Sequence, residues 1–499
     1  MATEHIAVID VGKTNKKVLV FNRELVLLES AYKKFEEVVR DDVHYEPVEE
    51  IFEWVKEQLK KFARDFNIRA ISVTTQGATA VCVDEDGNPA VPPVAYTTQA
   101  DEAFRRRFYE TCGDRETLQQ KTATAEIGDM INVAKLLFFS KETWPEQFER
   151  TQHILNYPQY FGYCLTGVAG AEPTYTGCHT YLYDFHKKAY SSVADALGVR
   201  DKLPTPIRKS WEVLGTVQQS VAQETGLSTD CIVTMGIHDS NSSLLPYLVK
   251  GYDNFVLNST GTWCVAMHPT DSVSFRPDEL GKLVFYNMDA FFNPVKTSIF
   301  MGGLEYETYT ELIGQLTPGA VKPAFDQERL QRIINERQLF ILPSVVRGTG
   351  LFPDAAPKIV EGDREYPLED VQSGKAVPDF LRDSETAYDV LNLSLAVQTR
   401  KALDMAGFTG GDIFTEGGFR KNVTYNRLMT ALYDDSRVSL TGLEEATAFG
   451  AAMLARAALD NTTPAETSAV FDIYTEPVPS PGLQGLHDYI QAFTAGLGN

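Results

Sequence analysis

The sequence is poor in cysteine and has neither a long apolar run nor a recognisable leader segment. Its six cysteines are scattered and include no C-x-x-C pair, so we expect free thiols in a reducing cytosol rather than a disulfide framework or a zinc site. No apolar stretch approaches the ~18 residues that a membrane-spanning helix needs. The N-terminus lacks a basic region followed by an apolar one, so no signal peptide is predicted. These absences favour a cytoplasmic protein.

Basic residues are also scarce relative to acidic ones. The 499 residues include 46 Lys+Arg and 68 Asp+Glu, which gives a formal net charge of −22. Binding to nucleic acid, or to an anionic membrane, needs a positive surface, so neither partner is expected. An anionic small ligand would have to be held by local groups: backbone N–H groups, a few lysines or a metal ion.

Two common nucleotide-binding motifs are missing. Gly12-Lys13-Thr14 is similar to the end of a P-loop, but that motif requires glycine where this chain has Ala7. No G-x-G-x-x-G segment follows a predicted strand, so a nicotinamide-dependent dehydrogenase is poorly supported.

The apolar pattern predicts strands that alternate with helices. In the N-terminal part we expect strands at 6–9, 18–21, 69–75 and 79–83 and an amphipathic helix at 47–67. Helical patterns dominate between about 105 and 230, as in 131–139 and 154–165. This alternation indicates an α/β fold with mixed sheets.

A second strand–turn–strand, residues 254–267, is similar to the one at residues 6–21. Its turn glycine, Gly261, follows Gly12 by 261 − 12 = 249 residues, about half the chain. Two similar hairpins, each opening one half of the sequence, favour duplicated α/β domains with a nucleotide cleft between them.

The boundary between the halves is expected near 246–252, where Pro246 and Gly251 interrupt the pattern. The predicted division is an N-terminal domain at 1–248, a C-terminal domain at 249–460 and a polar tail at 461–499. Late in the second domain we expect a strand at 413–415 and helices at 423–433 and 446–459.

Three turns have the composition of anion-binding or nucleoside-binding segments. The first hairpin tip offers backbone N–H groups and hydroxyls, and Asp10 at its mouth could hold a hydrated Mg²⁺, which prefers one or two carboxylates plus phosphate oxygens. The tip at 259–262 has three hydroxyls and one glycine, and 414–422 passes through paired glycines to a helix that Asn422 could cap. Each segment is equally compatible with an ordinary turn.

The segment 235–243 is the sharpest candidate for chemistry. An apolar run ends at Gly236, and His238 and Asp239 follow directly. A carboxylate at a strand end can accept a proton from a substrate hydroxyl, and phosphoryl transfer needs little more than positioning and a metal. The alternatives are that Asp239 caps a helix and that His238 is a core histidine; a neutral His238 could also fix a sugar hydroxyl.

The order of these motifs resembles the FGGY carbohydrate kinases, members of the actin/Hsp70/hexokinase-like ATPase group. The resemblance covers about residues 5–458 and also takes in 73–77, 84–87, 165–167 and 446–452. It implies two duplicated ribonuclease-H/actin-like domains, each a mixed sheet flanked by helices, with the active site in the cleft between them. The N-terminal domain would bind the sugar and the C-terminal domain ATP.

The resemblance also implies roles for individual residues. Asp239 would be the catalytic base, and Asp10 would lie near Mg²⁺. Substrate contacts would come from Gln76, Gly77, Tyr96, His238 and Asp239. Contacts to ATP and its phosphates would come from Gly12, Thr14, Asn15, Lys16, Gly261, Thr262, Gly417, Gly418 and Asn422.

The implied reaction is ATP-dependent phosphorylation of a ketose hydroxyl. The His238-Asp239 pair and the Gly261–Trp263 hairpin look like the rhamnulose-kinase branch, which points to L-rhamnulose or L-fuculose and their 1-phosphates. Many members carry an aromatic residue, an Asp and an Arg near residue 95; of these, 96–101 keeps only the aromatic residue, Tyr96, so the ketose stays open. The alternatives are a pentulose or polyol kinase acting on L-ribulose, xylulose or glycerol, and an actin/Hsp70-type nucleotide switch. A homodimer is common in the family.

Overall fold

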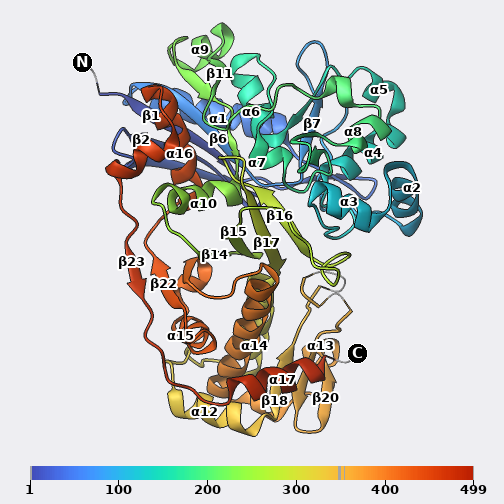
Figure 1. Cartoon of the computed structure of the whole chain (residues 1–499), viewed down its shortest axis with the longest axis vertical. Helices are drawn as coiled ribbons and strands as arrows, with labels where there is room; N and C mark the ends of the chain where they lie inside the picture. Colours follow the sequence, from blue (N-terminus) through green and yellow to red (C-terminus); the bar gives the residue numbers. More distant parts are fainter. Residues whose placement is uncertain (1–2, 347–349, 353, 498–499) are drawn as a thin grey trace. The chain divides into compact units, whose positions relative to one another are not determined.

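The chain folds into two compact units that are discontinuous in sequence (Figure 1). The computed structural model describes residues 3–346, 350–352 and 354–497. The first unit comprises the chain up to Tyr252, Thr270–Val295 and Leu443–Ile473. The second unit comprises Asp253–Pro269, Lys296–Gly442 and the chain from Tyr474 onward.

The first unit is built on a mixed sheet with the strand order β11-β12-β6-β1-β2-β3, in which β13 also pairs with β6. β1 is antiparallel to β2 and parallel to β6. These strands are β1 (His5–Val11), β2 (Asn15–Asn22), β3 (Leu27–Lys34), β6 (Ile68–Thr75), β11 (Val213–Thr216), β12 (Ile232–Thr234) and β13 (Ile237–His238).

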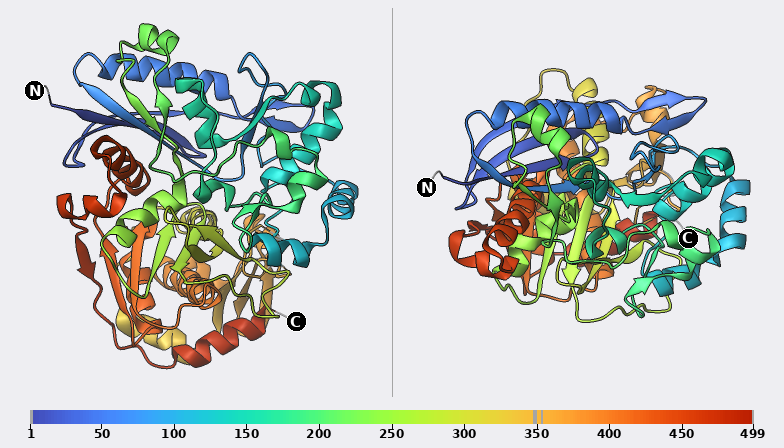
Figure 2. Two further views of the ribbon diagram at one scale, coloured as in Figure 1. Left: turned by 45° about the horizontal axis from the view of Figure 1, so that its top comes forward. Right: turned by 90° about the horizontal axis from the view of Figure 1, so that it is seen from above.

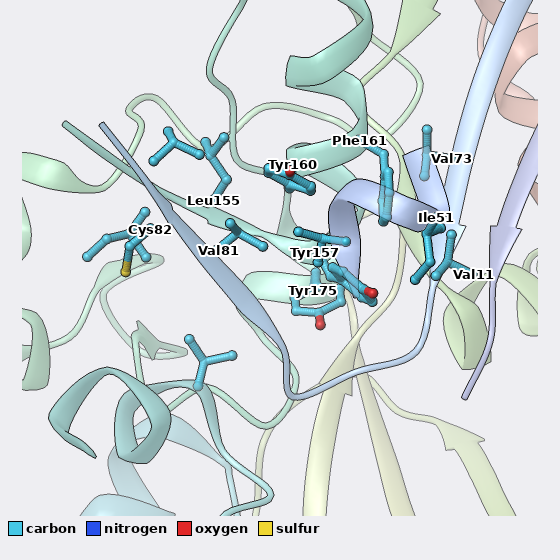
Figure 3. Close-up of a cluster of buried hydrophobic side chains, with 14 of the residues drawn as sticks. Val11, Ile51, Val73, Val81, Cys82, Leu155, Tyr157, Tyr160, Phe161 and Tyr175 are labelled. Atoms are coloured by element: carbon cyan, nitrogen blue, oxygen red, sulfur yellow. The ribbon is translucent and has the colours of Figure 1, made fainter. Parts of the chain in front are cut away.

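Both faces of the strand β1 are buried, because its alternate residues pack into different clusters. Ala7, Ile9 and Val11 face a core that includes α1 (Val48–Phe62) and α6 (Tyr157–Thr166), part of which is drawn in Figure 3. Ile6 and Val8 face a second core built around α16 (Ala446–Asp460). The sheet is therefore covered by helices on both sides, as its near-continuous apolar strands require.

The helix α16 joins the first unit although it comes from the C-terminal part of the sequence. It packs on β1, β6 and α10 (Asp239–Val249), and the views in Figures 1 and 2 show this red helix beside the blue strands. Small residues let it approach closely: a Cβ on Gly450 would lie 1.9 Å from the backbone oxygen of Ser242. The close packing explains why 443–473 belongs to this unit.

The first unit also contains elements that are not part of this sheet. They are β4 (Val38–Arg40), β5 (Val43–Tyr45), β7 (Ala80–Val83), α2 (Glu102–Cys112), α3 (Arg115–Thr122), α4 (Val133–Thr143), α5 (Pro145–Glu149), β8 (His153–Asn156), α7 (Pro173–Thr176), β9 (Tyr183–Asp184), β10 (Ala189–Tyr190), α8 (Ser192–Ala196), η1 (Arg200–Lys202), α9 (Gln219–Thr225), β16 (Val284–Met288) and η4 (Pro464–Val470).

The second unit repeats the strand order of the first. Among the strands of this unit the order is β17-β15-β14-β21-β22-β23, with β14 antiparallel to β15 and parallel to β21, as β1 is to β2 and β6. The strands are β14 (Phe255–Thr260), β15 (Cys264–Pro269), β17 (Pro294–Phe300), β21 (Asp412–Gly417), β22 (Arg437–Thr441) and β23 (Thr475–Pro477). The duplicated α/β fold predicted from the two hairpins is confirmed.

Helices and a small sheet complete the second unit. They are α11 (Gly302–Leu316), α12 (Gln327–Glu336), β18 (Leu339–Leu342), β19 (Lys358–Glu361), β20 (Arg364–Pro367), α13 (Leu368–Gln372), η2 (Asp379–Arg382), α14 (Ser384–Met405), η3 (Gly418–Lys421), α15 (Val423–Leu432) and α17 (Leu486–Gly496). None of the helices in the described part of the chain combines the length and apolar character that crossing a membrane requires.

Two of the predicted elements differ in extent or type. The helix expected at 47–67 is regular only to Phe62, because the chain then turns to enter β6. The helix expected at 154–165 begins at Tyr157; the preceding His153–Asn156 is the strand β8, which pairs with β7 outside the main sheet. Pro158 fits only the first turn of a helix, which explains why the helix starts there.

The compact units also differ from the predicted division at 249–460 and 461–499. The chain enters the second unit at Asp253, close to the expected boundary, but 270–295 and 443–473 return to the first unit. The segment 270–295 is tied to the first unit by backbone contacts, such as the bond from Tyr286 N–H to the carbonyl of Ala123 at 2.8 Å.

Candidate active site

Three adjacent strands of the first unit bring polar residues to one edge of the sheet. β1 and β13 lie on either side of β6 and run parallel to it, and both Asp10 and Ile237 are in register with Thr74. The pair His238-Asp239 follows Ile237 directly. Because parallel strands end at the same edge, Asp10 and Asp239 flank the carboxyl end of β6, where α/β proteins commonly place their ligands.

Asp239 is the first residue of α10 and does not cap it; the N-cap position is His238. Its Oδ1 accepts a bond from the backbone N–H of Ser240 at 2.6 Å and lies 3.1 Å from Nε2 of His238. The side chain keeps 29% of its surface exposed. Burial raises the pKa of Asp239 to about 6, against the lowering effects of Ser240 and Lys17. A carboxylate with these properties can act as a proton acceptor near neutral pH.

His238 is a buried, neutral side chain. Its ring is held between the Nδ2 of Asn241, 3.0 Å from Nδ1, and Gly77, where a Cβ would lie 2.9 Å from Nε2. Burial lowers the pKa of His238 to about 3. The alternative of a core histidine therefore describes its burial correctly; its Nε2 lies 3.8 Å from Sγ of the buried Cys178 and 3.1 Å from Oδ1 of Asp239.

Asp10 shares a lysine with a residue from the C-terminal part of the first unit. Nζ of Lys17 lies 3.4 Å from Oδ2 of Asp10 and donates to Oε2 of Glu445 at 2.5 Å. Burial raises the pKa of Asp10 to about 6, with Lys17 lowering it and Asp239 and Glu445 raising it. Asp10, Lys17 and Glu445 thus form one charged cluster, and Asp239 is close enough to act electrostatically on Asp10.

The tip of the first hairpin has two exposed residues and one buried lysine. Thr14 and Asn15 are exposed, and the N–H of Gly12 donates to the carbonyl of Asn15 at 3.1 Å. Lys16 is 2% exposed, and its Nζ donates to the carbonyl of Lys13 at 2.9 Å. The ammonium group of Lys16 therefore stabilises the tip itself.

Gln76 and Tyr96 lie in a charged cluster near the same edge. Nζ of Lys13 donates to Glu46 at 2.8 Å and to Glu37, and it stands 4.5 Å above the ring of Tyr96. Nε2 of Gln76 donates to Glu46 at 3.0 Å. The Oε1 of Gln76 is buried and has no hydrogen-bond partner within the described ranges, which leaves an acceptor for a ligand hydroxyl.

The glycine turns of the second unit pack directly against one another. A Cβ on Gly303, at the start of α11, would lie 2.0 Å from the carbonyl oxygen of Gly261, and one on Gly417 would lie 2.1 Å from that of Thr260. Oγ1 of Thr260 accepts from the N–H of Phe419 at 2.9 Å. The structure thereby brings Gly261, Thr262, Gly417 and Gly418 into one backbone cluster.

Asn422 caps α15 and borders a cavity. Its Oδ1 accepts from the N–H of Tyr425 at 3.2 Å, and its Nδ2 donates to Asn392 at 2.7 Å. A cavity of about 300 Å³ adjoins these residues, a size found for small-molecule sites. Its walls are formed by Lys322, Pro323, Ala324, Phe325, Tyr388, Asp389, Asn392, Lys421, Asn422, Val423 and Thr424.

Two models of one protein family together match most of the chain. The N-terminal domain of the FGGY family of carbohydrate kinases matches residues 5–246, and the carbohydrate kinase FGGY C-terminal domain matches residues 253–464. The chain belongs to the FGGY family of carbohydrate kinases.

Individual relatives of this FGGY chain are distant. It is 27% identical to a probable L-xylulose kinase of Pasteurella multocida over 42% of both chains. It is 24% identical to a rhamnulokinase of Halalkalibacterium halodurans over 51% of this chain and 54% of the relative. An L-fuculokinase of Escherichia coli (strain K12) is 25% identical over 54% of this chain and 57% of the relative. The chain spans about half the length of these curated relatives.

Solved structures share the fold over the full length. A carbohydrate kinase from Novosphingobium aromaticivorans has a TM-score of 0.78 at 24% identity and covers 100% of this chain and 99% of its own. A ligand-bound xylulose kinase from Lactobacillus acidophilus has a TM-score of 0.80 at 16% identity, with coverages of 99% and 96%. At these identities the likeness shows the FGGY fold alone.

The donor set at Asp10 fits a magnesium ion that also binds phosphate. Mg²⁺ is usually held by one or two carboxylates together with phosphate oxygens and water. Asp10 is such a carboxylate, and its pKa is raised chiefly by burial and further by the nearby Asp239 and Glu445, against the lowering effect of Lys17. Within residues 3–346, 350–352 and 354–497, no group of three or more His, Cys, Asp or Glu forms a closed metal cage.

Sequence reasoning missed five charged residues of this FGGY site. They are Lys13, Lys17, Glu37, Glu46 and Glu445. Lys17 could have been predicted from the geometry of the hairpin, since it is paired with Asp10 across β1 and β2. Glu37 and Glu46 come from an irregular segment around β4 and β5, and Glu445 from the distant start of α16, so no local pattern marks them.

Proposed function

We propose that this FGGY chain is an ATP-dependent kinase that phosphorylates a hydroxyl of a neutral ketose, with Asp239 as the general base. The observation that supports this most is the placement of Asp10 and Asp239 on either side of β6, each with a pKa raised to about 6. A base whose pKa lies near the working pH combines the right protonation state with sufficient basicity.

The chemical step needs one proton acceptor and local positive charge. A carboxylate oxygen of Asp239 takes the proton of the attacking hydroxyl, the hydroxyl oxygen bonds to the terminal phosphorus of ATP, and the bond to ADP breaks. Lys17 would supply positive charge. Mg²⁺, held by Asp10 together with phosphate oxygens, would neutralise phosphate charge when bound.

The nucleotide belongs to the second unit in this proposal. Gly261, Thr262, Gly417 and Gly418 are exposed, which suits contact of their backbone with phosphates. The nucleoside would occupy the cavity beside Asn422. Both polar groups of Asn422 already bond to protein, so its part would be to shape the wall.

The acceptor is proposed to be an uncharged sugar. Lys13, the cation nearest Tyr96, is neutralised by Glu37 and Glu46, so it offers little to a substrate carboxylate. Gln76 and His238 can bond to hydroxyls. Relatives named rhamnulokinase, L-fuculokinase and probable L-xylulose kinase support a ketose. We propose L-rhamnulose or L-fuculose, phosphorylated at the 1-hydroxyl, with L-xylulose as the competing acceptor.

The test is a coupled assay of ADP release with 6-deoxyketoses, pentuloses and glycerol, run on the wild type and on Asp239→Asn. We expect one ketose to be preferred in kcat/KM, and the variant to lose kcat by about 10²–10⁴-fold with ATP binding intact. Asp230→Asn, at an exposed aspartate of the same unit, is the matched control and should keep kcat.

Two results would contradict the proposal. If Asp239→Asn keeps more than a few per cent of the wild-type kcat, Asp239 is not the base. If ATP turnover is equally fast with and without sugar, the chain acts as a nucleotide switch of the actin/Hsp70 type instead.

A further inference from the structure

We propose that Asp389 selects the base of the nucleotide: its free carboxylate oxygen accepts a hydrogen bond from the 6-amino group of adenine and repels the 6-oxo group of hypoxanthine or guanine. This inference rests on the proposed function, in which the nucleoside occupies the cavity beside Asn422 in the second unit. It assigns a specificity-determining role to a buried carboxylate that the phosphoryl-transfer step does not use.

Asp389 has one oxygen that is engaged by protein and one that is not. It lies on α14, borders the cavity of about 300 Å³ and is 1% exposed. Its Oδ2 accepts from Nε of Arg329 at 2.6 Å, whereas its Oδ1 accepts no hydrogen bond from any residue that the structure describes. Oδ1 is also not one of the fully buried polar atoms that lack a partner in the described part of the chain. The small accessible part of this side chain therefore includes Oδ1, and the space that Asp389 borders is the cavity.

The carboxyl group of Asp389 is an acceptor at neutral pH. Burial raises its pKa to about 6, against the lowering effect of Arg329, so the ionised form dominates at pH 7 and above. An ionised carboxylate has no proton to donate. A ligand group that meets Oδ1 must therefore be a donor, since an acceptor placed there would leave two desolvated oxygens facing each other without a proton between them.

The order of contacts along α14 places Asp389 beyond the glycine turns and Asn422. Gln398 donates at 2.7 Å to Glu305, which lies in the turn of α11 that packs on the hairpin tip. Nearly two turns earlier in α14, Asn392 accepts from Asn422 at 2.7 Å. Asp389 is one turn earlier again, about 4.5 Å further along the helix axis. A nucleotide whose phosphates meet the glycine turns would thus pass Asn422 with its ribose and reach Asp389 with its base.

The same cavity has an apolar part, made by Pro323, Ala324, Phe325 and Val423. Apolar side chains suit the faces of a purine, while a few polar groups fix its orientation. At the 6-position adenine carries an amino group that donates, whereas guanine carries an oxygen that accepts; hypoxanthine carries the same oxygen. Oδ1 of Asp389 therefore distinguishes purines by hydrogen bonding rather than by size.

The test compares ATP with ITP, the nucleotide of hypoxanthine, in an assay of sugar phosphate formation. We expect the wild type to prefer ATP in kcat/KM by about 10–100-fold, the range for one hydrogen bond to a charged group. In Asp389→Asn the amide can turn its NH₂ toward the 6-oxo group, so the ratio of kcat/KM for ATP to that for ITP should fall by about tenfold or more. Because both nucleotides are measured on one preparation, this ratio does not depend on the folded fraction.

Glu385→Gln is the matched control. Glu385 is a second carboxylate bonded to Arg329, whose Nη1 donates to it at 2.8 Å, but its side chain is 62% exposed and lies outside the cavity wall. This substitution removes an ion pair of the same arginine and should leave the ratio within twofold of the wild type. Three results would overturn the inference: an equal change of the ratio in both variants, equal losses with ATP and ITP in Asp389→Asn, or a wild type that uses the two nucleotides equally.

The failure of the proposed function has a different appearance. Binding of ADP and IDP, measured by calorimetry without sugar, reports the selection of the base alone. If none of the tested sugars is phosphorylated but ADP binds at least tenfold more tightly than IDP, the assignment as a ketose kinase is wrong and the role of Asp389 stands. If a ketose is phosphorylated but ADP binds no more tightly than IDP, the kinase stands and this inference is wrong.

Discussion

Replacing Gly303 by alanine gives the sharpest test of the phosphate turn in the second unit. Gly303 lies in the first turn of α11, where the tip of the β14–β15 hairpin rests on the helix. An added Cβ would lie 2.0 Å from the carbonyl oxygen of Gly261 and 3.0 Å from Cα of Thr262. Since ordinary contacts begin near 3.4 Å, the tip must move by about 3.4 − 2.0 = 1.4 Å.

The size of the effect follows from this displacement. A misplacement of about 1 Å in a site that orients substrate costs on the order of 10²-fold in rate. We therefore expect Gly303→Ala to lower kcat/KM for ATP by about 100-fold while the sugar KM stays within threefold. Overpacking should also cost about 1–3 kcal/mol of stability, more than the ~1 kcal/mol that alanine gains in a helix.

The assay pairs ATP titrations of the coupled reaction with urea denaturation, and Gly314→Ala is the matched control. Gly314 lies in the same helix and is exposed, and a Cβ added there would meet no atom within 4 Å. This control should be as active as the wild type and more stable by about 0.5–1 kcal/mol. A Gly303→Ala enzyme whose kcat/KM for ATP stays within threefold of the wild type would refute the assignment of this tip to the phosphates.

Two further predictions concern charged groups of the first unit. Glu126→Gln should lower the free energy of unfolding, measured in urea, by about 3–5 kcal/mol, because the side chain of Lys135, which is 2% exposed, loses its charged partner. The control is Glu142→Gln, at an exposed ion pair, which should change this free energy by less than about 0.5 kcal/mol. Equal effects of the two substitutions would contradict the reasoning. Although burial alone would raise the pKa of Glu126, its bonds to Arg105 and Lys135 lower it from 4.5 to about 2. The contribution of ionised Glu126 to stability is therefore complete above pH 4.5 and is lost as the pH falls toward 2. The kcat/KM of the wild type should fall as the pH drops through about 6, where Asp239 takes up a proton; a rate that is flat from pH 8 to 5 would be inconsistent with this base.

The parts of the fold that follow from local pattern were predictable from sequence. Short apolar runs on either side of a polar turn marked β1–β2 and β14–β15, and their similarity predicted the duplication that the strand orders confirm. The packing of α16 on the first unit was not predictable. Its alanine-rich sequence shows that it approaches another element closely, but only the fold identifies β1, β6 and α10 as its neighbours.

In the candidate site, residue positions were easier to predict than residue roles. Asp10 and Asp239 each come at the end of an apolar run, so their position at one edge of the sheet could be predicted from the strand topology. The sugar contact expected of Gly77 stays a prediction, and the structure adds that the absence of a Cβ at Gly77 leaves room for the imidazole of His238. A sequence does not show which polar atoms are already engaged, because the partners come from segments far apart in the chain.

The ionised carboxylates of Asp10 and Asp239 destabilise the folded state of the protein when no ligand is bound. Asp10 and Asp239 each have a pKa raised from 3.8 to about 6, a shift of 6 − 3.8 = 2.2. A carboxyl whose folded pKa is raised destabilises the folded state increasingly as the pH rises from 3.8 to 6, and fully above that, by about 3 kcal/mol for a shift of this size. The pKa values of about 6 already include the lowering effect of Lys17, which Asp10 shares with Glu445. Such a cost is retained where it serves function: two carboxylates whose pKa values are raised by burial provide a proton acceptor at neutral pH and a place for a cation. In a chain with a net charge of −22, the cation brought with the nucleotide would supply what the protein's own lysines do not.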